Sequence, residues 1–125
     1  MSIDSPRLTY DCVIVGAGPA GLSAALMLGR CRRKTLVCDT GEPRNIRSAG
    51  LHNYLTRDGI PPAEFLQHAR QDVARYLTVE LRQVEVLDAG RSPDGFRLIC
   101  GDGRQIATRK LLLATGVVDE LPELQ

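Results

Sequence analysis

The stretch that decides the fold is Cys12-Val13-Ile14-Val15-Gly16-Ala17-Gly18-Pro19-Ala20-Gly21, in which an apolar run leads directly into the pattern G-x-G-x-x-G. Gly16 allows a tight turn out of a strand, Gly18 allows a backbone to approach a pyrophosphate, and Gly21 allows the following helix to pack closely on the sheet. The N-terminus of that helix then faces the phosphates, where its unpaired N–H groups stabilise an anion without a lysine. The pattern predicts a dinucleotide site.

The pattern G-x-G-x-x-G also arises by chance in turns. The elements around the glycines therefore decide whether it marks a dinucleotide site. Residues 8–15 have the composition of a buried strand, residues 20–32 carry apolar side chains at helical spacing, and residues 34–38 form a second apolar run. Asp39 then follows Gly16 at about the distance expected of the acid that binds a ribose. A carboxylate there repels a 2′-phosphate, so FAD or NAD fits this site better than NADP.

Composition restricts the other classes of function. The 125 residues include 16 basic and 15 acidic side chains, and this near neutrality argues against nucleic acid as a partner. We interpret the basic group at residues 30–34 as favourable charge at the end of the first helix. With 43% apolar and 25% charged residues, the chain has the composition of a single soluble domain.

The sequence contains no pattern typical of a membrane span, a leader or a metal site. No apolar run approaches the roughly 18 residues that cross a bilayer, and the first residues have no leader pattern. We therefore expect a cytoplasmic protein without a membrane partner. The four cysteines show no C-x-x-C or other metal spacing, so we expect neither a metal nor a disulfide at Cys12, Cys31, Cys38 and Cys100.

Beyond Asp39 the character of the chain changes. Residues 39–60 are dense in Gly, Pro and polar side chains, which predicts a long loop that is either functional or a solvated surface loop. Its polar groups that could reach a ligand are Arg44, Asn45, His52, Asn53, Arg57 and Asp58. A helix is expected over residues 63–76, after Pro61-Pro62.

The last third of the chain predicts strands. Turn signals at residues 93–95 and 101–103 separate apolar runs, and we expect a three-stranded antiparallel meander formed by residues 79–87, 96–100 and 105–108. A further buried strand is expected over residues 110–114, ending on Thr115-Gly116. The strands and helices together predict an α/β protein.

This order resembles the first part of the FAD domain in flavin-dependent pyridine nucleotide-disulfide oxidoreductases. Residues 16–21, Asp39, the polar loop, the meander and residues 112–116 carry the resemblance, which is strongest to the thioredoxin reductase-like branch. The runs Gly41-Glu42-Pro43-Arg44-Asn45 and His52-Asn53-Tyr54-Leu55-Thr56-Arg57-Asp58-Gly59 are similar to its bacterial and fungal dithiol oxidoreductases. The resemblance implies a Rossmann-like, FAD-binding fold of three layers with a small antiparallel β-meander and an incomplete sheet.

The resemblance also implies which residues bind FAD. The pyrophosphate would be lined by Gly16, Gly18, Pro19 and Ala20, and the adenosine ribose would be held by Asp39.

The remaining implied contacts lie further along the chain. Asn53 would lie near the flavin ring, the backbone of Val84 would contact the adenine, and Ala114, Thr115 and Gly116 would close over the cofactor. A glycine allows close approach of a backbone, and a threonine hydroxyl can bond a phosphate or a neighbouring loop.

The resemblance further implies parts that this sequence lacks. Family members continue into an NADPH domain with a redox C-x-x-C and then return to complete the FAD domain. This chain has one G-x-G-x-x-G and no closely spaced cysteine pair, whereas hydride delivery and disulfide exchange need both. We therefore expect residues 1–125 to be the N-terminal portion of an FAD-binding domain, with the NAD(P)H domain absent, and to be inactive alone as a disulfide reductase.

The implied parent activity is that of an NAD(P)H-dependent disulfide or dithiol oxidoreductase, in which electrons pass from NADPH through FAD to a disulfide. Its partner would be a thioredoxin-like protein or a small dithiol, and a homodimer is one assembly it could form. Two alternatives stay open. The chain could be a stand-alone flavin- or nucleotide-binding module without catalysis of its own, or part of another two-dinucleotide flavoenzyme such as a monooxygenase.

Overall fold

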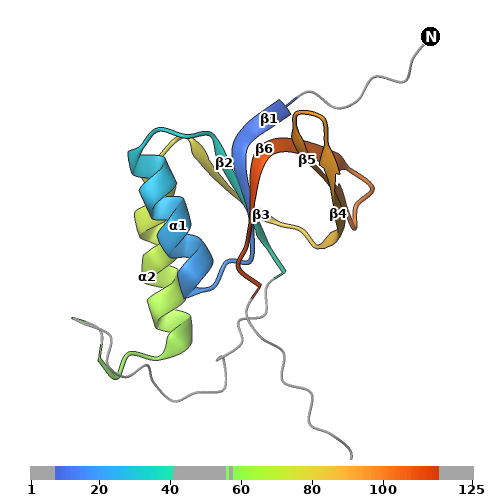
Figure 1. The fold of residues 1–125 in the computed structure, drawn as a ribbon. Coiled ribbons are helices and arrows are strands. Elements are labelled where there is room, and N and C mark those ends of the chain that lie inside the picture. Colours follow the sequence, from blue (N-terminus) through green and yellow to red (C-terminus); the bar gives the residue numbers. More distant parts are fainter. Residues whose placement is uncertain (1–7, 41–55, 57, 116–125) are drawn as a thin grey trace, which may run out of the picture.

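The computed structural model of the chain describes residues 8–40, 56 and 58–115. Its helices and strands follow in the order β1 (Leu8–Val15), α1 (Pro19–Arg30), β2 (Thr35–Asp39), α2 (Pro62–Ala74), β3 (Val79–Gln83), β4 (Val86–Ser92), β5 (Gly95–Cys100) and β6 (Gln105–Leu113) (Figure 1). The hydrogen-bonded order of the strands is β3-β2-β1-β6-β5-β4. The α/β class is therefore confirmed.

The sheet has a parallel part and an antiparallel part. Strands β3, β2, β1 and β6 pair in parallel, while β4, β5 and β6 pair antiparallel. Figure 1 shows α1 and α2 side by side on one face of the parallel strands and the antiparallel strands curling over the other side. The result is a three-layer arrangement of helices, parallel sheet and meander. The meander is the antiparallel part formed by β4, β5 and the first residues of β6.

The predicted strand over residues 79–87 is wrong as a single strand, and it is not part of the meander. Residues Val79–Gln83 form β3, which pairs in parallel with β2, and the antiparallel part begins at Val86 with β4. The chain changes partner across the link Val84-Glu85. This link contains neither Gly nor Pro, so the composition of the run does not mark the change.

The predicted break between residues 105–108 and 110–114 is also wrong, because one strand, β6, covers Gln105–Leu113. This strand serves both parts of the sheet: residues 105–108 pair with β5, and residues 107–113 pair with β1. The Thr108 hydroxyl is buried and contacts the carbonyl oxygens of Tyr10, at 3.2 Å, and Lys110, at 3.0 Å. The polar pair Arg109-Lys110 therefore lies within the strand.

The two layers on either side of the parallel strands enclose two separate cores. Alternate residues of a strand point to opposite faces. Val13 and Leu36 therefore face the meander, and Ile14 and Val37 face the helices. All four side chains are fully buried.

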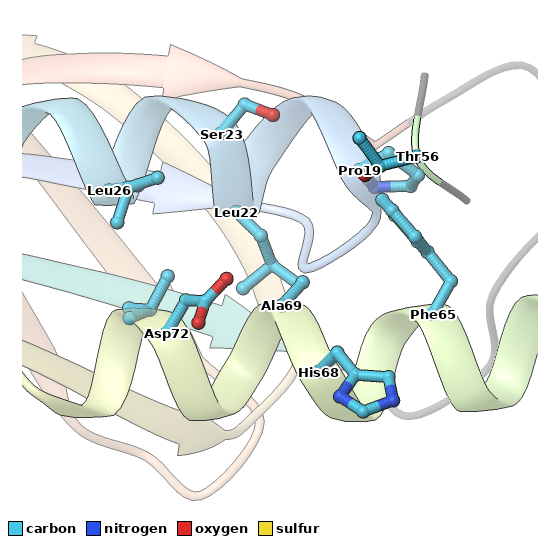
Figure 2. A pocket seen from close by; sticks show the side chains of 10 residues that line it. Pro19, Leu22, Ser23, Leu26, Thr56, Phe65, His68, Ala69 and Asp72 are labelled. Atoms are coloured by element: carbon cyan, nitrogen blue, oxygen red, sulfur yellow. The ribbon is translucent and has the colours of Figure 1, made fainter. Parts of the chain in front are cut away.

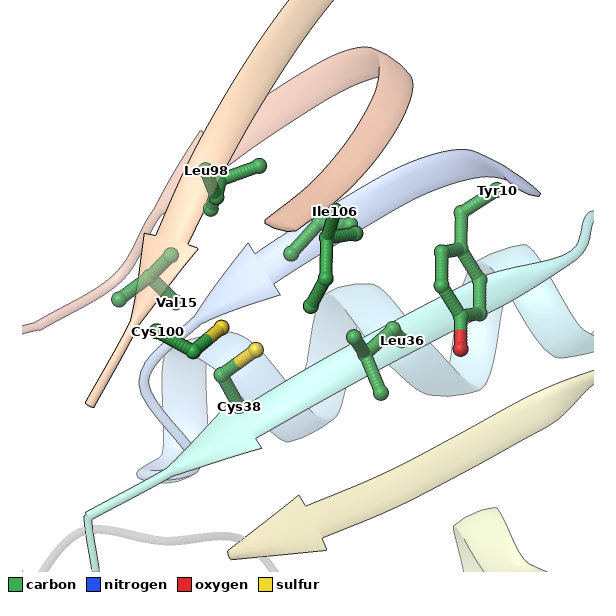
Figure 3. Packing of buried hydrophobic residues seen from close by; sticks show 8 residues of the cluster. Tyr10, Val15, Leu36, Cys38, Leu98, Cys100 and Ile106 are labelled. Atoms are coloured by element: carbon green, nitrogen blue, oxygen red, sulfur yellow. The ribbon is translucent and has the colours of Figure 1, made fainter. Parts of the chain in front are cut away.

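The core under the meander joins side chains from β1, β2, β5 and β6 (Figure 3). Leu98 of β5 is 0% exposed and lies over this layer. Cys38 of β2 and Cys100 of β5 point toward one another within it (Figure 3). The meander is thus held by the same kind of apolar burial as the helices.

The helices cover only part of the parallel sheet. Leu22, Leu66 and Val73 bring α1 and α2 onto β1 and β2. On β6, by contrast, Leu112 is 39% exposed and Leu113 is 67% exposed. No helix within the described residues is long and apolar enough to span a bilayer.

Replacing Leu98 by Ala should lower the free energy of unfolding by about 2–5 kcal/mol, because it leaves a cavity between the meander and the parallel sheet. The matched control is Ile99→Ala, at the next position of β5, where the side chain is 40% exposed. That change should cost about 1 kcal/mol or less. Urea unfolding monitored by circular dichroism measures both, and equal losses would contradict the assignment of this core.

The four free thiols should react at very different rates. Cys31 is exposed, whereas Cys12, Cys38 and Cys100 are buried. Burial raises the pKa of each buried thiol, and the neighbouring Cys100 thiol adds to the effect at Cys38, whose pKa rises to about 11. Because the thiolate is the reactive form, these three are nearly unreactive at pH 8.

Titration of the folded chain with Ellman's reagent at pH 8 should therefore show one fast thiol, and all four should react after unfolding in guanidinium chloride. Cys31→Ser should remove the fast phase. A fast phase that survives this substitution would place a second thiol at the surface.

Candidate dinucleotide-binding site

The carboxyl ends of the parallel strands meet at one edge of the sheet. Backbone hydrogen bonds continue the pairing just past the strands: Gly16 N donates to Cys38 O at 2.9 Å, and Ala114 N donates to Val15 O at 2.8 Å. Val84 N donates to Asp39 O at 3.0 Å. These bonds hold the turn after β1, the acid at the end of β2 and the link after β3 next to one another.

The turn after β1 requires glycine at two positions. Gly16 has a φ of +116°, and a Cβ there would overlap the carbonyl oxygen of Ala114. A Cβ at Gly21 would overlap the carbonyl oxygen of Gly16. The turn, the first turn of α1 and the end of β6 therefore pack backbone against backbone. This geometry supports the roles that the sequence predicts for Gly16 and Gly21 in the fold.

Gly18 differs from both. A Cβ built at Gly18 would meet no atom within 4 Å, so nothing within the described residues requires a glycine there. Gly18 is the N-cap of α1, and its carbonyl accepts the first helical hydrogen bond, from Leu22 N at 3.0 Å. The amide groups of Ala20 and Gly21 precede that bond, and no side chain in the described part of the chain caps the helix.

The space at Gly18 and the uncapped N–H groups together form a cradle for an anion. The first turn of α1 contains no acidic residue, so this turn itself contributes no carboxylate that would repel a phosphate. Pro19 stands at the start of the helix, where its missing N–H costs nothing. The residues present fit a pyrophosphate.

Asp39 is the last residue of β2 and lies at the same edge. Its carboxylate is 21% exposed and accepts a hydrogen bond from Arg70 Nη2 to Oδ2 at 2.6 Å. Arg70 belongs to α2 and was not among the predicted site residues. The available signal was weak: position 70 follows Leu66 by one helical turn, at the border of the apolar stripe of that helix.

The other predicted residues divide between the described and the undescribed parts of the chain. Val84 lies at the edge, in the link after β3 instead of on a meander strand. Ala114 and Thr115 follow β6 and adjoin Gly16. Asn53 and Gly116 lie outside the described residues, as does most of the polar loop.

A groove of about 260 Å³ lies beside the glycine turn, between α1 and α2 (Figure 2). Leu22, Phe65 and Val73 line it, with His68 and Asp72 on the side of α2. Pro19 is the one predicted cofactor residue among those lining it. The groove therefore adjoins the predicted site and does not contain it.

A polar cluster occupies the meander-facing side of β1 and β3. The Tyr10 hydroxyl donates to Glu80 Oε2 at 2.5 Å, and Arg82 Nη2 donates to Glu80 Oε1 at 2.6 Å. The hydrogen bond from Tyr10 lowers the pKa of Glu80, while burial and Glu80 raise the pKa of Tyr10. The cluster is satisfied internally, and we assign it to the fold and not to the dinucleotide site.

The parallel sheet with a glycine turn after β1 and an acid at the end of β2 defines a Rossmann-like α/β protein. The chain belongs to the pyridine nucleotide-disulphide oxidoreductase family, whose sequence pattern matches residues 10–125.

Its relatives include proteins named as thioredoxin reductases. The chain is 37% identical to a probable thioredoxin reductase of Arthroderma benhamiae over 94% of its own length and 30% of the relative. It is 42% identical to the thioredoxin reductase aclD of Aspergillus oryzae, over 92% of its own length and 37% of that relative. The chain thus spans about a third of the length of these curated relatives.

Solved structures agree with this placement. An oxidoreductase from Agrobacterium tumefaciens superposes with a TM-score of 0.87 at 41% identity, covering 94% of this chain and 40% of that one. A putative thioredoxin reductase TrxB from Bacillus anthracis gives a TM-score of 0.85 at 36% identity, with coverages of 91% and 39%. The resemblance to the thioredoxin reductase-like branch is therefore confirmed.

The two glycines of the turn should differ sharply under substitution. Gly16→Ala should lower the free energy of unfolding by about 3 kcal/mol, because it combines a positive φ with overlap against the backbone at Ala114. Gly18→Ala should leave the free energy of unfolding within about 1 kcal/mol of the original, since its Cβ enters open space. Thermal unfolding without ligand compares the two, and equal losses would contradict the described turn.

Proposed function

We propose that this chain binds FAD at the carboxyl edge of its parallel sheet and forms the flavin-binding part of an NAD(P)H-dependent disulfide or dithiol oxidoreductase. The observation that carries the proposal is the space that the described residues leave open at Gly18, between the N-terminus of α1, which none of their side chains caps, and the turn held by Gly16. Bound FAD would supply the two-electron chemistry through which electrons pass from NADPH to a disulfide.

The glycine turn and α1 would hold the pyrophosphate. Gly16, Gly18, Pro19 and Ala20 would line it, with the free amide groups of the first helical turn donating to its oxygens. The field of the helix adds favourable charge at the same place. No lysine or metal is needed for a diphosphate that is bound and not cleaved.

The neighbouring strand ends would hold the adenosine half. The Asp39 carboxylate would accept the ribose hydroxyls, and the backbone of Val84, tied to Asp39 by its N–H, would contact the adenine. Ala114 and Thr115 would flank the turn on its other side, next to Gly16. The family resemblance adds Gly116 to that side.

The flavin half would extend toward residues outside the described part of the chain. On the family resemblance, Asn53 would lie near the flavin ring. Residues 1–125 would then constitute the N-terminal portion of an FAD-binding domain. On the same resemblance, the NADPH site and the redox cysteine pair would belong to other parts of the parent enzyme, and the disulfide partner would be a thioredoxin-like protein or a small dithiol.

The test is a titration of the purified chain with FAD, followed by gel filtration and a visible absorption spectrum. Shifted flavin bands are expected in the titration, with weak retention of FAD on the column. Gly18→Ala should weaken FAD binding about tenfold, because the added methyl group stands where the pyrophosphate approaches. The matched control is Gly90→Ala on β4, where a Cβ also meets no atom within 4 Å. It should bind FAD as the original does.

A folded chain that neither binds FAD nor shifts its spectrum would contradict the proposal. Equal effects of Gly18→Ala and Gly90→Ala would place the flavin elsewhere. Binding of ADP without binding of FAD would favour a nucleotide-binding module over a flavin-binding one.

A further inference from the structure

Arg70 forms an ion pair with Asp39, one of the predicted site residues. Its Nη2 lies 2.6 Å from Asp39 Oδ2, while the Arg70 side chain is 42% exposed and that of Asp39 is 21% exposed. The two residues come from different elements, α2 and β2. The contact therefore forms only when the chain is folded.

The rest of α2 fixes the place of the guanidinium. Leu66 and Val73, on either side of Arg70 along the helix, are 4% and 1% exposed and pack in the core under the helices. A helix anchored at both points cannot slide relative to β2 without breaking that packing. Arg70 is consequently presented to the carboxylate by a rigid element, not by a loop.

The bond to Arg70 has a specific effect on the carboxylate. A free aspartate at a strand end turns about its two side-chain bonds, and a ligand that needs one orientation must restrict that motion on binding. A charge-assisted hydrogen bond selects one orientation in advance. A carboxylate has about four acceptor positions, so the bond from Arg70 occupies only one of the positions that a ribose hydroxyl could use.

Charge gives a second effect in the same direction. A dinucleotide brings a negative pyrophosphate close to the negative Asp39 side chain, and like charges at short range oppose binding. The positive charge of Arg70, in contact with Asp39, offsets that repulsion while the oxygens of Asp39 remain acceptors.

We propose that Arg70 is a positioning residue, which orients the Asp39 carboxylate for the hydroxyls of the adenosine ribose and so raises the affinity for the cofactor through Asp39. The inference rests on the proposed FAD site. It gives helix α2 a role in ligand recognition, namely to orient the Asp39 carboxylate, in addition to the roles of the glycine turn and the strand ends.

The test measures the binding of FAD, ADP and 2′,3′-dideoxy-ADP by calorimetry to the original chain and to Arg70→Gln. Arg70→Gln should weaken the binding of FAD and ADP about fivefold, the effect expected from losing one partly exposed charged contact. It should leave the binding of 2′,3′-dideoxy-ADP nearly unchanged, because that probe has no 2′- or 3′-hydroxyl that could donate a hydrogen bond to Asp39. In an Asp39→Asn background, the substitution should add little further loss.

Two further variants separate positioning from general helix stability. Arg70→Lys retains the charge and should restore part of the affinity. Arg75→Gln is the matched control: Arg75 follows α2, is 77% exposed and pairs with Asp72 at 3.7 Å, away from Asp39. It should bind all three probes as the original does, and circular dichroism and the Tm verify that each variant folds.

Each remaining outcome overturns the inference. Equal losses for ADP and 2′,3′-dideoxy-ADP, or additive losses with Asp39→Asn, would mean that Arg70 acts on the fold or on the phosphates and not through Asp39. FAD binding by the original chain that Arg70→Gln does not change would overturn this inference and leave the proposed function standing. Failure of the original chain to bind FAD would overturn both.

Discussion

The structure depends on a place where three backbones meet without side chains between them. The turn at Gly16 lies against the end of β6 at Ala114, and the first turn of α1 at Gly21 lies against the carbonyl of Gly16. A single methyl group at either glycine would displace a helix or a strand. This close packing positions the N-terminus of α1 at the carboxyl edge of the sheet, and the anion cradle at Gly18 exists because of it.

The central strand β1 makes the three layers interdependent. Its alternate side chains belong to two cores, one under the helices and one under the meander, so β1 contributes to both at once. Strand β6 connects the same layers through the backbone, since it pairs with β1 and with β5. The carboxyl edge of the parallel sheet is thereby supported from both faces, and neither the helices nor the meander can shift without disturbing the ends of the strands.

The sequence was informative where a feature depends on neighbours along the chain. The turn at Gly16, helix α1 and Asp39 at the end of β2 all follow from local spacing, and the structure has them in those places. Boundaries set by a change of partner were missed. The link Val84-Glu85 carries no turn residue, and Arg109 within β6 looked like a break. Arg70 was missed for a related reason, because its contact with Asp39 joins residues that only tertiary packing brings together.

The pairing of β1 with β6 has a consequence for how the chain folds during synthesis. Leu8 pairs with Ala107 and Val15 with Leu113, so almost the whole described chain separates the partners. The unit formed by β1, α1 and β2 can assemble early from local contacts. One edge of β1 then stays unpaired until β6 has been synthesised. An unpaired apolar edge invites association with other strands. The residues of β6 that complete the carboxyl edge of the parallel sheet therefore also end the period in which the nascent chain is open to aggregation.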